Sequence, residues 1–202
     1  MPDNERARIR SIMYEPSSVW LATEYSGRRW LTDQFVLYDV TGAEVLHCYD
    51  TSYDVVWPDG PYQLMATGVW RAQTRDSIPE PDIEAYFRNL AGKVSWRPAR
   101  PTEWSVAEHP GKAMLWISEE VPCLLGESTW TAIKRHHPDV VVEYGHSDSF
   151  NVFRFSEVRH DPDCEEGGVH CGHRPVPFCF AAGIRVPEGQ EDVAYEIALA
   201  AK

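Results

Sequence analysis

The sequence lacks several features that would point to a function at once. It contains no apolar run long enough to cross a bilayer, and its opening, MPDNERARIR, is too polar and charged for a secretion signal. No phosphate-binding loop, nucleophile elbow or calcium-loop spacing is present. We therefore expect a cytoplasmic protein that contacts no membrane and is not an enzyme.

Positive charge is also scarce in this chain. Lys and Arg number 19 against 31 Asp and Glu, which gives a formal net charge of −12 at pH 7. This balance argues against coating of nucleic acid by the whole surface, because such binding needs an excess of cations facing phosphate. It leaves room for a local basic strip. The acidic residues are scattered, so they favour solubility over the regular spacing that mimicry of DNA by an inhibitor would require.

The cysteines are odd in number, five in 202 residues. Together with the polar N-terminus, this argues against a disulfide scaffold. What the chain does contain is 43% hydrophobic residues, 25% charged residues and eight Trp. This composition is typical of a globular protein with a well-filled core.

Hydrophobic patterning predicts a β-rich α+β fold in which two main helices pack on antiparallel sheets. The stretch Trp30–Gly42 is an unusual strand, because Asp33 lies close to its apolar run. The predicted strands span residues 18–25, 30–42, 43–49, 62–70, 112–118, 140–145, 150–158 and 179–186.

Two segments have the apolar spacing and the end signals of helices. Residues 79–93 begin with two prolines and Asp82, which suits the positive end of a helix, and Gly92 is expected to close this helix. Residues 126–139 form the second predicted helix, in which Ser128 is the expected cap and Pro138 is expected to end the helix.

The ends of the chain and its middle are less clearly patterned. Residues 5–14 fit a short helix or an extended start, and residues 188–202 fit a helix or a frayed strand. The Pro- and Arg-rich segment 96–104 is interpreted as a connector between two halves. We therefore predict an N-terminal α+β half over residues 1–97 and a C-terminal α+β half over residues 98–202.

Residues 160–179 hold three of the five cysteines and three of the eight histidines. Thiolate and imidazole groups are ligands that Zn²⁺ prefers, and a glycine-rich loop can wrap a tetrahedral site. The loop has no C-x₂-C knuckle, so an exposed polar loop without metal is the alternative, and catalytic zinc is a third interpretation. If structural zinc binds, the expected ligands are Cys164, Cys171, His173 and Cys179, with His170 as a substitute.

Two adjacent titratable pairs are further candidate sites. His136 and His137 precede a proline at the end of a predicted helix, where interaction with the helix C-terminus is preferred over catalysis. Glu119 and Glu120 could form an acid–base pair, but adjacent residues at a strand end point apart, so a solvated turn is favoured.

Several segments, taken in order, carry a family resemblance. Thr32-Asp33 stands early in a strand, and the C-terminal half runs helix, strand, strand, final strand. These features resemble the Ala-Thr-Asp-Gly-His-Arg-Leu strand and the last module of bacterial sliding clamps, the β subunit of the replicative polymerase. The C-terminal segments that match are 129–134, 140–143, 151–155 and 180–186, with Arg185 at the family's Arg position.

The chain also departs from this family. Gln34 replaces the glycine of the motif, and the Met-Pro pair of the final strand is missing. The loop at 160–179 is inserted between the last two strands, and the residues after Val186 extend past the point where the family usually ends. A diverged viral relative would show such departures.

The resemblance implies repeated βαβββ modules and a non-catalytic ring that encircles double-stranded DNA and binds replication proteins. A ring needs only weak, nonspecific phosphate contacts from basic helix residues, since the DNA is held topologically. Two clamp-type domains per chain would require about three chains, so a homo-oligomer, a trimer, is expected. The DNA-facing residues that it implies are Arg88, Lys93, Lys134 and Arg135.

Other interpretations remain open for these residues and for the chain. The four basic residues also fit ordinary solubilising charge that complements the negative ends of helices. The alternative function is a small acidic interaction or inhibitor protein with a zinc-stapled loop at 160–179 and no DNA binding.

Overall fold

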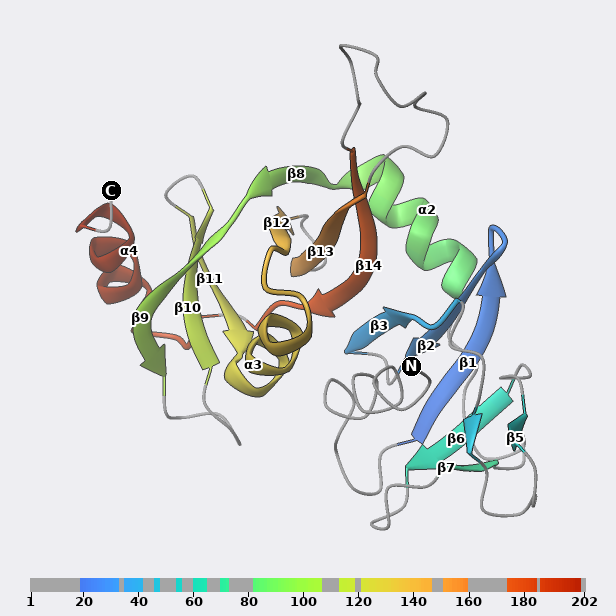
Figure 1. Ribbon diagram of the computed structural model, residues 1–202. Coiled ribbons are helices and arrows are strands. Elements are labelled where there is room, and N and C mark those ends of the chain that lie inside the picture. The colour runs from blue at the N-terminus through green and yellow to red at the C-terminus, as the bar shows by residue number, and fades with distance from the viewer. Residues whose placement is uncertain are drawn as a thin grey trace, which may run out of the picture. The chain divides into compact units, whose positions relative to one another are not determined.

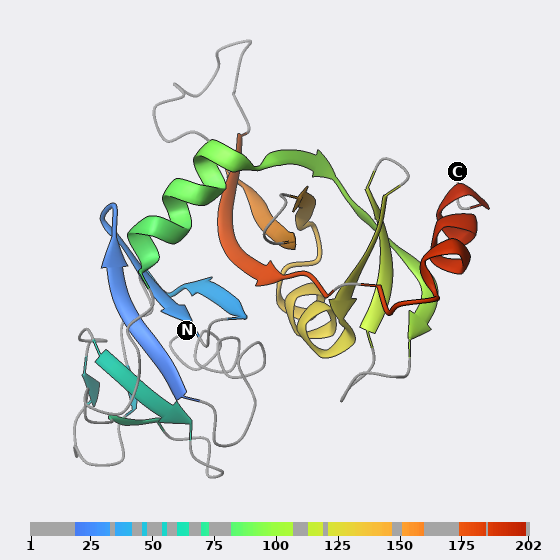
Figure 2. The same cartoon turned by 180° about the vertical axis from the view of Figure 1, so that it is seen from behind.

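A computed structural model divides the chain into two compact units, Met1–Val94 and Ser95–Lys202, and each is described by itself (Figure 1, Figure 2). The predicted boundary after residue 97 falls inside the first strand of the second unit, β8 (Ser95–Pro98). The residues that the structure describes are 19–32, 35–41, 46–47, 54–55, 60–64, 70–72, 82–106, 113–118, 121–146, 151–159, 174–184 and 186–200. The predicted segment 5–14 and Asp33 lie outside them.

The first unit is built on an antiparallel sheet with the strand order β7-β6-β1-β2-β3, and β4 pairs separately with β5. Ser26 and Gly27 connect β1 to β2 with φ angles of 52° and 70°. These positive values belong to the two-residue hairpin turn that a Ser-Gly pair predicts. The strands are β1 (Val19–Tyr25), β2 (Arg28–Thr32), β3 (Val36–Asp39), β4 (Leu46–His47), β5 (Asp54–Val55), β6 (Gly60–Leu64) and β7 (Trp70–Ala72).

Helix α2 (Ile83–Lys93) lies within the predicted segment 79–93 and begins after Asp82. Asp82 is its N-cap, and the Asp82 carboxylate accepts a hydrogen bond from the Ala85 N–H at 2.7 Å. The predicted helix is therefore confirmed. Gly92 does not close it, because the helix continues to Lys93 and ends at an extended Val94.

An aromatic contact holds α2 against its sheet. The Phe87 ring stacks on Tyr25 with 4.6 Å between centroids and lies 5.0 Å from Trp30. Trp30 is only 2% exposed, whereas Tyr25 and Phe87 are half-buried, so this cluster joins the helix to the buried side of the sheet.

The second unit contains two antiparallel sheets, ordered β14-β13-β12-β8 and β11-β10-β9. Helix α3 (Glu127–His136) follows β11, and helix α4 (Glu191–Ala200) follows β14. The prediction of a strand-rich α+β chain with antiparallel sheets is thus confirmed. The remaining strands are β9 (Arg100–Val106), β10 (Ala113–Ser118), β11 (Val121–Gly126), β12 (Val141–His146), β13 (Asn151–Arg159) and β14 (Arg174–Ala182).

The predicted connector at 96–104 is wrong. Its residues form most of β8 and the first part of β9, which pair with β12 and β10. Pro98 and Pro101 suggested a break, but both strands lie at the edges of their sheets. An edge position tolerates proline because one side of the strand makes no ladder hydrogen bonds.

Strand β10 is buried on both faces. The Trp116 ring lies 5.5 Å from Phe153 of β13 and 4.7 Å from Trp130 of α3. Leu115, which points to the opposite face, packs in a cluster with Ala194 of α4. The three-stranded sheet is therefore covered on one side by the aromatic core and on the other by α4, as Figure 2 shows for that helix.

The two helices of this unit test three further predictions. Ser128 does not cap α3, because β11 runs directly into the helix, Gly126 is the N-cap and no side chain caps it. The helix ends at His136, just before Pro138, as predicted. Of the two interpretations of residues 188–202, the helix is confirmed by α4. No helix in the described ranges is long and apolar enough to cross a bilayer.

The position of Phe153 predicts a large loss of stability on truncation. Phe153→Ala removes a ring that is 0% exposed and contacts Trp116 and Tyr144, so the free energy of unfolding should fall by about 3–5 kcal/mol. Val158→Ala is the control on the same strand: that side chain is 51% exposed, and its loss should cost less than about 1 kcal/mol. Urea unfolding measures the free energy of unfolding of both variants, and equal losses would contradict the burial of Phe153 in the core.

Candidate functional site

The solvent face of α3 carries only hydroxyl and cationic side chains. Its exposed residues are Ser128, Thr131, Lys134 and Arg135. Their spacing of three and four places them on one face of the helix. Hydroxyl, ammonium and guanidinium groups are the side chains that contact nucleic-acid phosphates. This surface, the α3 face, is the candidate site.

The buried side of α3 fixes the direction of this face. Ala132 and Ile133 are 6% and 0% exposed. The Trp130 ring meets Trp116 edge to face, with an interplanar angle of 89°. Because these contacts hold the helix from within the second unit, the α3 face cannot turn inward without breaking the core.

The two cations of the α3 face are held differently. The Lys134 ammonium donates a hydrogen bond to the Pro138 carbonyl at 2.9 Å and lies 5.7 Å from the centroid of the Trp130 ring. Arg135 makes no ion pair with any residue in the described part of the chain. Both complement the negative end of the helix, and Arg135 is the more available of the two for an external anion.

His137 connects the end of α3 to strands β13 and β14 of the four-stranded sheet. Its backbone N–H donates to the Ile133 carbonyl at 2.8 Å, which closes the last turn. Its imidazole is buried, stacks on Phe178 with 4.0 Å between centroids, and makes a short contact through Nδ1 with the Glu157 carboxylate. The predicted position at the helix C-terminus is confirmed, whereas the partner Glu157 was not predicted.

The other two predicted DNA-facing residues lie on α2 in the first unit. Arg88 is exposed and pairs with Glu84, four residues earlier, at 2.7 Å. Lys93 is exposed in the last turn. Since α2 and α3 belong to different units, the expectation that all four basic residues face one duplex stays a prediction.

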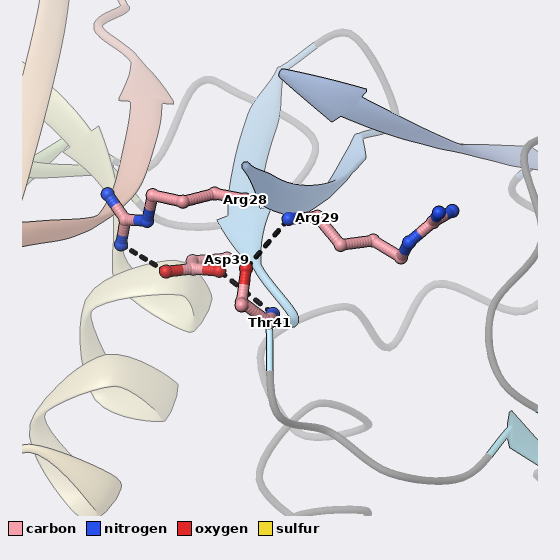
Figure 3. Close-up of polar contacts among 4 residues, drawn as sticks. All are labelled: Arg28, Arg29, Asp39 and Thr41. Atoms are coloured by element: carbon pink, nitrogen blue, oxygen red, sulfur yellow. Dashed lines mark hydrogen bonds and ion pairs between the residues drawn. The ribbon is translucent and has the colours of Figure 1, made fainter. Parts of the chain in front are cut away.

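A polar network that the sequence did not indicate joins β2 and β3 (Figure 3). Arg28 forms an ion pair with Asp39, and its guanidinium lies 4.7 Å from the Trp30 ring centroid. The Thr41 N–H donates to Asp39 at 2.9 Å, and the Thr41 hydroxyl accepts from the Arg29 N–H at 2.7 Å. In Figure 3 the Arg29 side chain points away from this network. These contacts hold the start of β2 against the end of β3 and so stabilise the hairpin.

A second such cluster lies on the four-stranded sheet. The Arg154 side chain donates to Glu143 at 2.7 Å, and its guanidinium stacks 4.1 Å from the Trp96 ring centroid. Arg154 and Glu143 face each other across β13 and β12. The two residues are eleven positions apart, and the antiparallel register of β12 and β13 places them opposite each other.

The predicted metal ligands fall mostly outside the described residues. Cys164, Cys171 and His173 lie there, as does the Glu119–Glu120 pair. Cys179 is described, and it is fully buried within β14 opposite Phe155. Within the described ranges, no three His, Cys, Asp or Glu side chains come together as a metal site. The zinc site stays a prediction.

Two ionisable groups lie deep in the core of the second unit. Burial raises the pKa of the Cys123 thiol, which donates to the Trp116 carbonyl at 3.5 Å. Burial, and then the neighbouring Cys123, raise the pKa of Tyr144. Both groups therefore stay protonated and act as core residues instead of nucleophiles.

Comparison with protein-family models, curated proteins and solved structures found no match to this chain. The geometry of the α3 face and the sequence resemblance are therefore the grounds on which a function is proposed.

The raised pKa values predict loss of stability in alkali. Above the ordinary pKa values of 9.0 for Cys123 and 10.0 for Tyr144, the unfolded chain loses protons that the native state keeps. The free energy of unfolding should then fall with rising pH, by up to about 1.4 kcal/mol per pH unit for each group. Tyr144→Phe should make this dependence shallower, while Tyr195→Phe, at an exposed tyrosine, should not. Urea unfolding between pH 8 and 11 provides the measurement, and identical slopes for both variants would refute it.

The zinc prediction is tested by elemental analysis of protein purified without chelator. If the loop binds structural zinc, about one ion per chain is expected, and Cys171→Ser should remove it. Cys48→Ser, which changes a cysteine far from the loop in sequence, should leave the content unchanged. Zinc-free protein of full stability would exclude the site.

Proposed function

We propose that this chain is a non-catalytic DNA-contacting protein of the sliding-clamp type. The observation that carries the proposal is the α3 face, on which all fully exposed side chains are hydroxyl-bearing or cationic and the one acid of the helix, Glu127 in its first turn, is only partly exposed. Such a face suits weak phosphate contacts that carry no sequence information. The contacts would be made chiefly by Lys134 and Arg135.

The order of elements in the second unit supports the same proposal. The chain runs β11, α3, β12, β13, β14, which is the strand–helix–three-strand order of a clamp module (Figure 1). The last three strands pair as antiparallel neighbours. Strand β11 pairs in the three-stranded sheet with β10 and β9. The first strand of this module therefore lies in a different sheet from its last three strands.

The charge of the whole molecule is compatible with this mode of binding. With a net charge of −12, most of the surface repels DNA, and productive contact is confined to a local cationic face. A ring compensates for weak contacts because the duplex is enclosed. We propose that about three chains form this ring.

Charge reversal at the α3 face tests the proposal. Arg135→Glu should weaken binding of a short labelled duplex at low salt by about tenfold, and should lower the slope of log affinity against log salt by about 1 or more. Arg174→Glu is the matched control, since it makes the same change of net charge at an exposed residue of β14. Fluorescence anisotropy measures both; equal weakening by the two variants would contradict a specific role for α3.

Light scattering at high protein concentration tests the ring in the same samples. A mass near three times the 23.0 kDa of one chain is expected. A strict monomer would contradict enclosure of DNA, even if Arg135 proved to contact phosphate.

The second candidate is a small acidic interaction protein that does not bind DNA. The ion pair between Arg88 and Glu84 favours it, because it neutralises one of the four expected DNA-facing cations within its own helix. If neither the natural chain nor any variant binds duplex DNA at low salt, this second function replaces the first.

A further inference from the structure

Helix α4 presents apolar side chains to solvent although one of its sides is buried. Ala194 and Ala198 are both 0% exposed, and Ala194 packs in the cluster formed with Leu115 and Leu124 of the three-stranded sheet. Figure 2 shows the helix lying along this sheet. The outward side chains include Tyr195 and Leu199, which are 47% and 41% exposed.

These two outward residues form one ridge. Tyr195 and Leu199 are four positions apart, so their side chains are neighbours on the helix surface. Glu191 and Asp192 lie one turn before Tyr195, and Glu196 lies one turn before Leu199. The ridge is thus bordered by three exposed carboxylates, of which that of Glu191 also accepts a hydrogen bond from the Gly189 N–H at 2.6 Å, and α4 contains no basic residue. We call Tyr195, Leu199 and these three acids the α4 ridge.

We propose that the α4 ridge binds an amphipathic segment of a partner protein that combines apolar side chains with Lys or Arg. Two large apolar side chains at helical spacing suit the apolar stripe of such a segment. The three carboxylates would pair with its cations, which orients the segment and attracts it over a distance of about 10 Å at moderate salt.

The charge of the ridge argues against a second copy of this chain as the occupant. A symmetric contact between two α4 helices would bring identical sets of carboxylates together, and like charges in contact repel. Val193 supplies an internal control, because it is 49% exposed and lies on a different side of the helix from Tyr195 and Leu199, although Glu196 is its neighbour three positions on.

A model peptide provides the test. The probe is a synthetic amphipathic helix of Leu and Lys, and its binding to the full chain is measured by calorimetry at low salt. Tyr195→Ser combined with Leu199→Ser should weaken binding at least about tenfold, whereas Val193→Ser should change it less than about twofold. A peptide with Glu in place of Lys should not bind. Unchanged thermal unfolding midpoints show that the variants are folded.

Three outcomes would overturn the proposal. Equal weakening by the ridge variant and by Val193→Ser would mean that binding is not directed to this ridge. Undiminished binding of the Glu peptide would remove the role of the carboxylates. Self-association of the chain that is lost in the ridge variant would make a second copy the occupant. The affinity of the same variants for duplex DNA should not change. Failure of the α4 ridge proposal can therefore be distinguished from failure of the proposed DNA contact.

Discussion

The burial of β10 on both faces is the constraint on which the second unit depends. Successive side chains of a strand point to opposite sides, so Trp116 reaches Trp130 of α3 and Phe153 of β13, while Leu115 packs towards Ala194 of α4. One strand thereby positions both helices. Since Trp116 and Leu115 are each 0% exposed, neither helix can shift without opening a cavity, and cavities in protein cores are costly.

This arrangement gives two helices opposite surface chemistry. The α3 face exposes hydroxyl and cationic groups, and the α4 ridge exposes apolar and acidic groups. The helices contact side chains of β10 that point to opposite faces of its sheet. An acidic protein can then carry a cationic surface, because the charges are separated by a layer of strands. Such separation permits contact with phosphate on one helix and with a basic partner on the other.

Much of the fold could be predicted from the sequence because helix starts and tight turns are determined by residues close together in the chain. Asp82 and the apolar spacing after it located α2. The single strand expected over residues 30–42 is wrong, because β2 and β3 are separate strands that pair antiparallel. The segment 96–104 was misread because its prolines suggested a break, although edge strands accommodate them. The contact of His137 with Glu157 could not be foreseen, since it depends on how β13 and β14 are brought to the end of α3. Lys134 and Arg135 could be singled out from the sequence because they lie in the last turn of a predictable helix, and their exposure is visible only in the structure.

The proposed function depends on contact between the α3 face and DNA. A heteronuclear NMR titration of the isotope-labelled chain with a short duplex tests this contact residue by residue. We expect the largest amide shifts at Ser128, Thr131, Lys134 and Arg135, and no shifts of the amides of α4. Shifts concentrated on other elements, or no shifts at low salt, would contradict it.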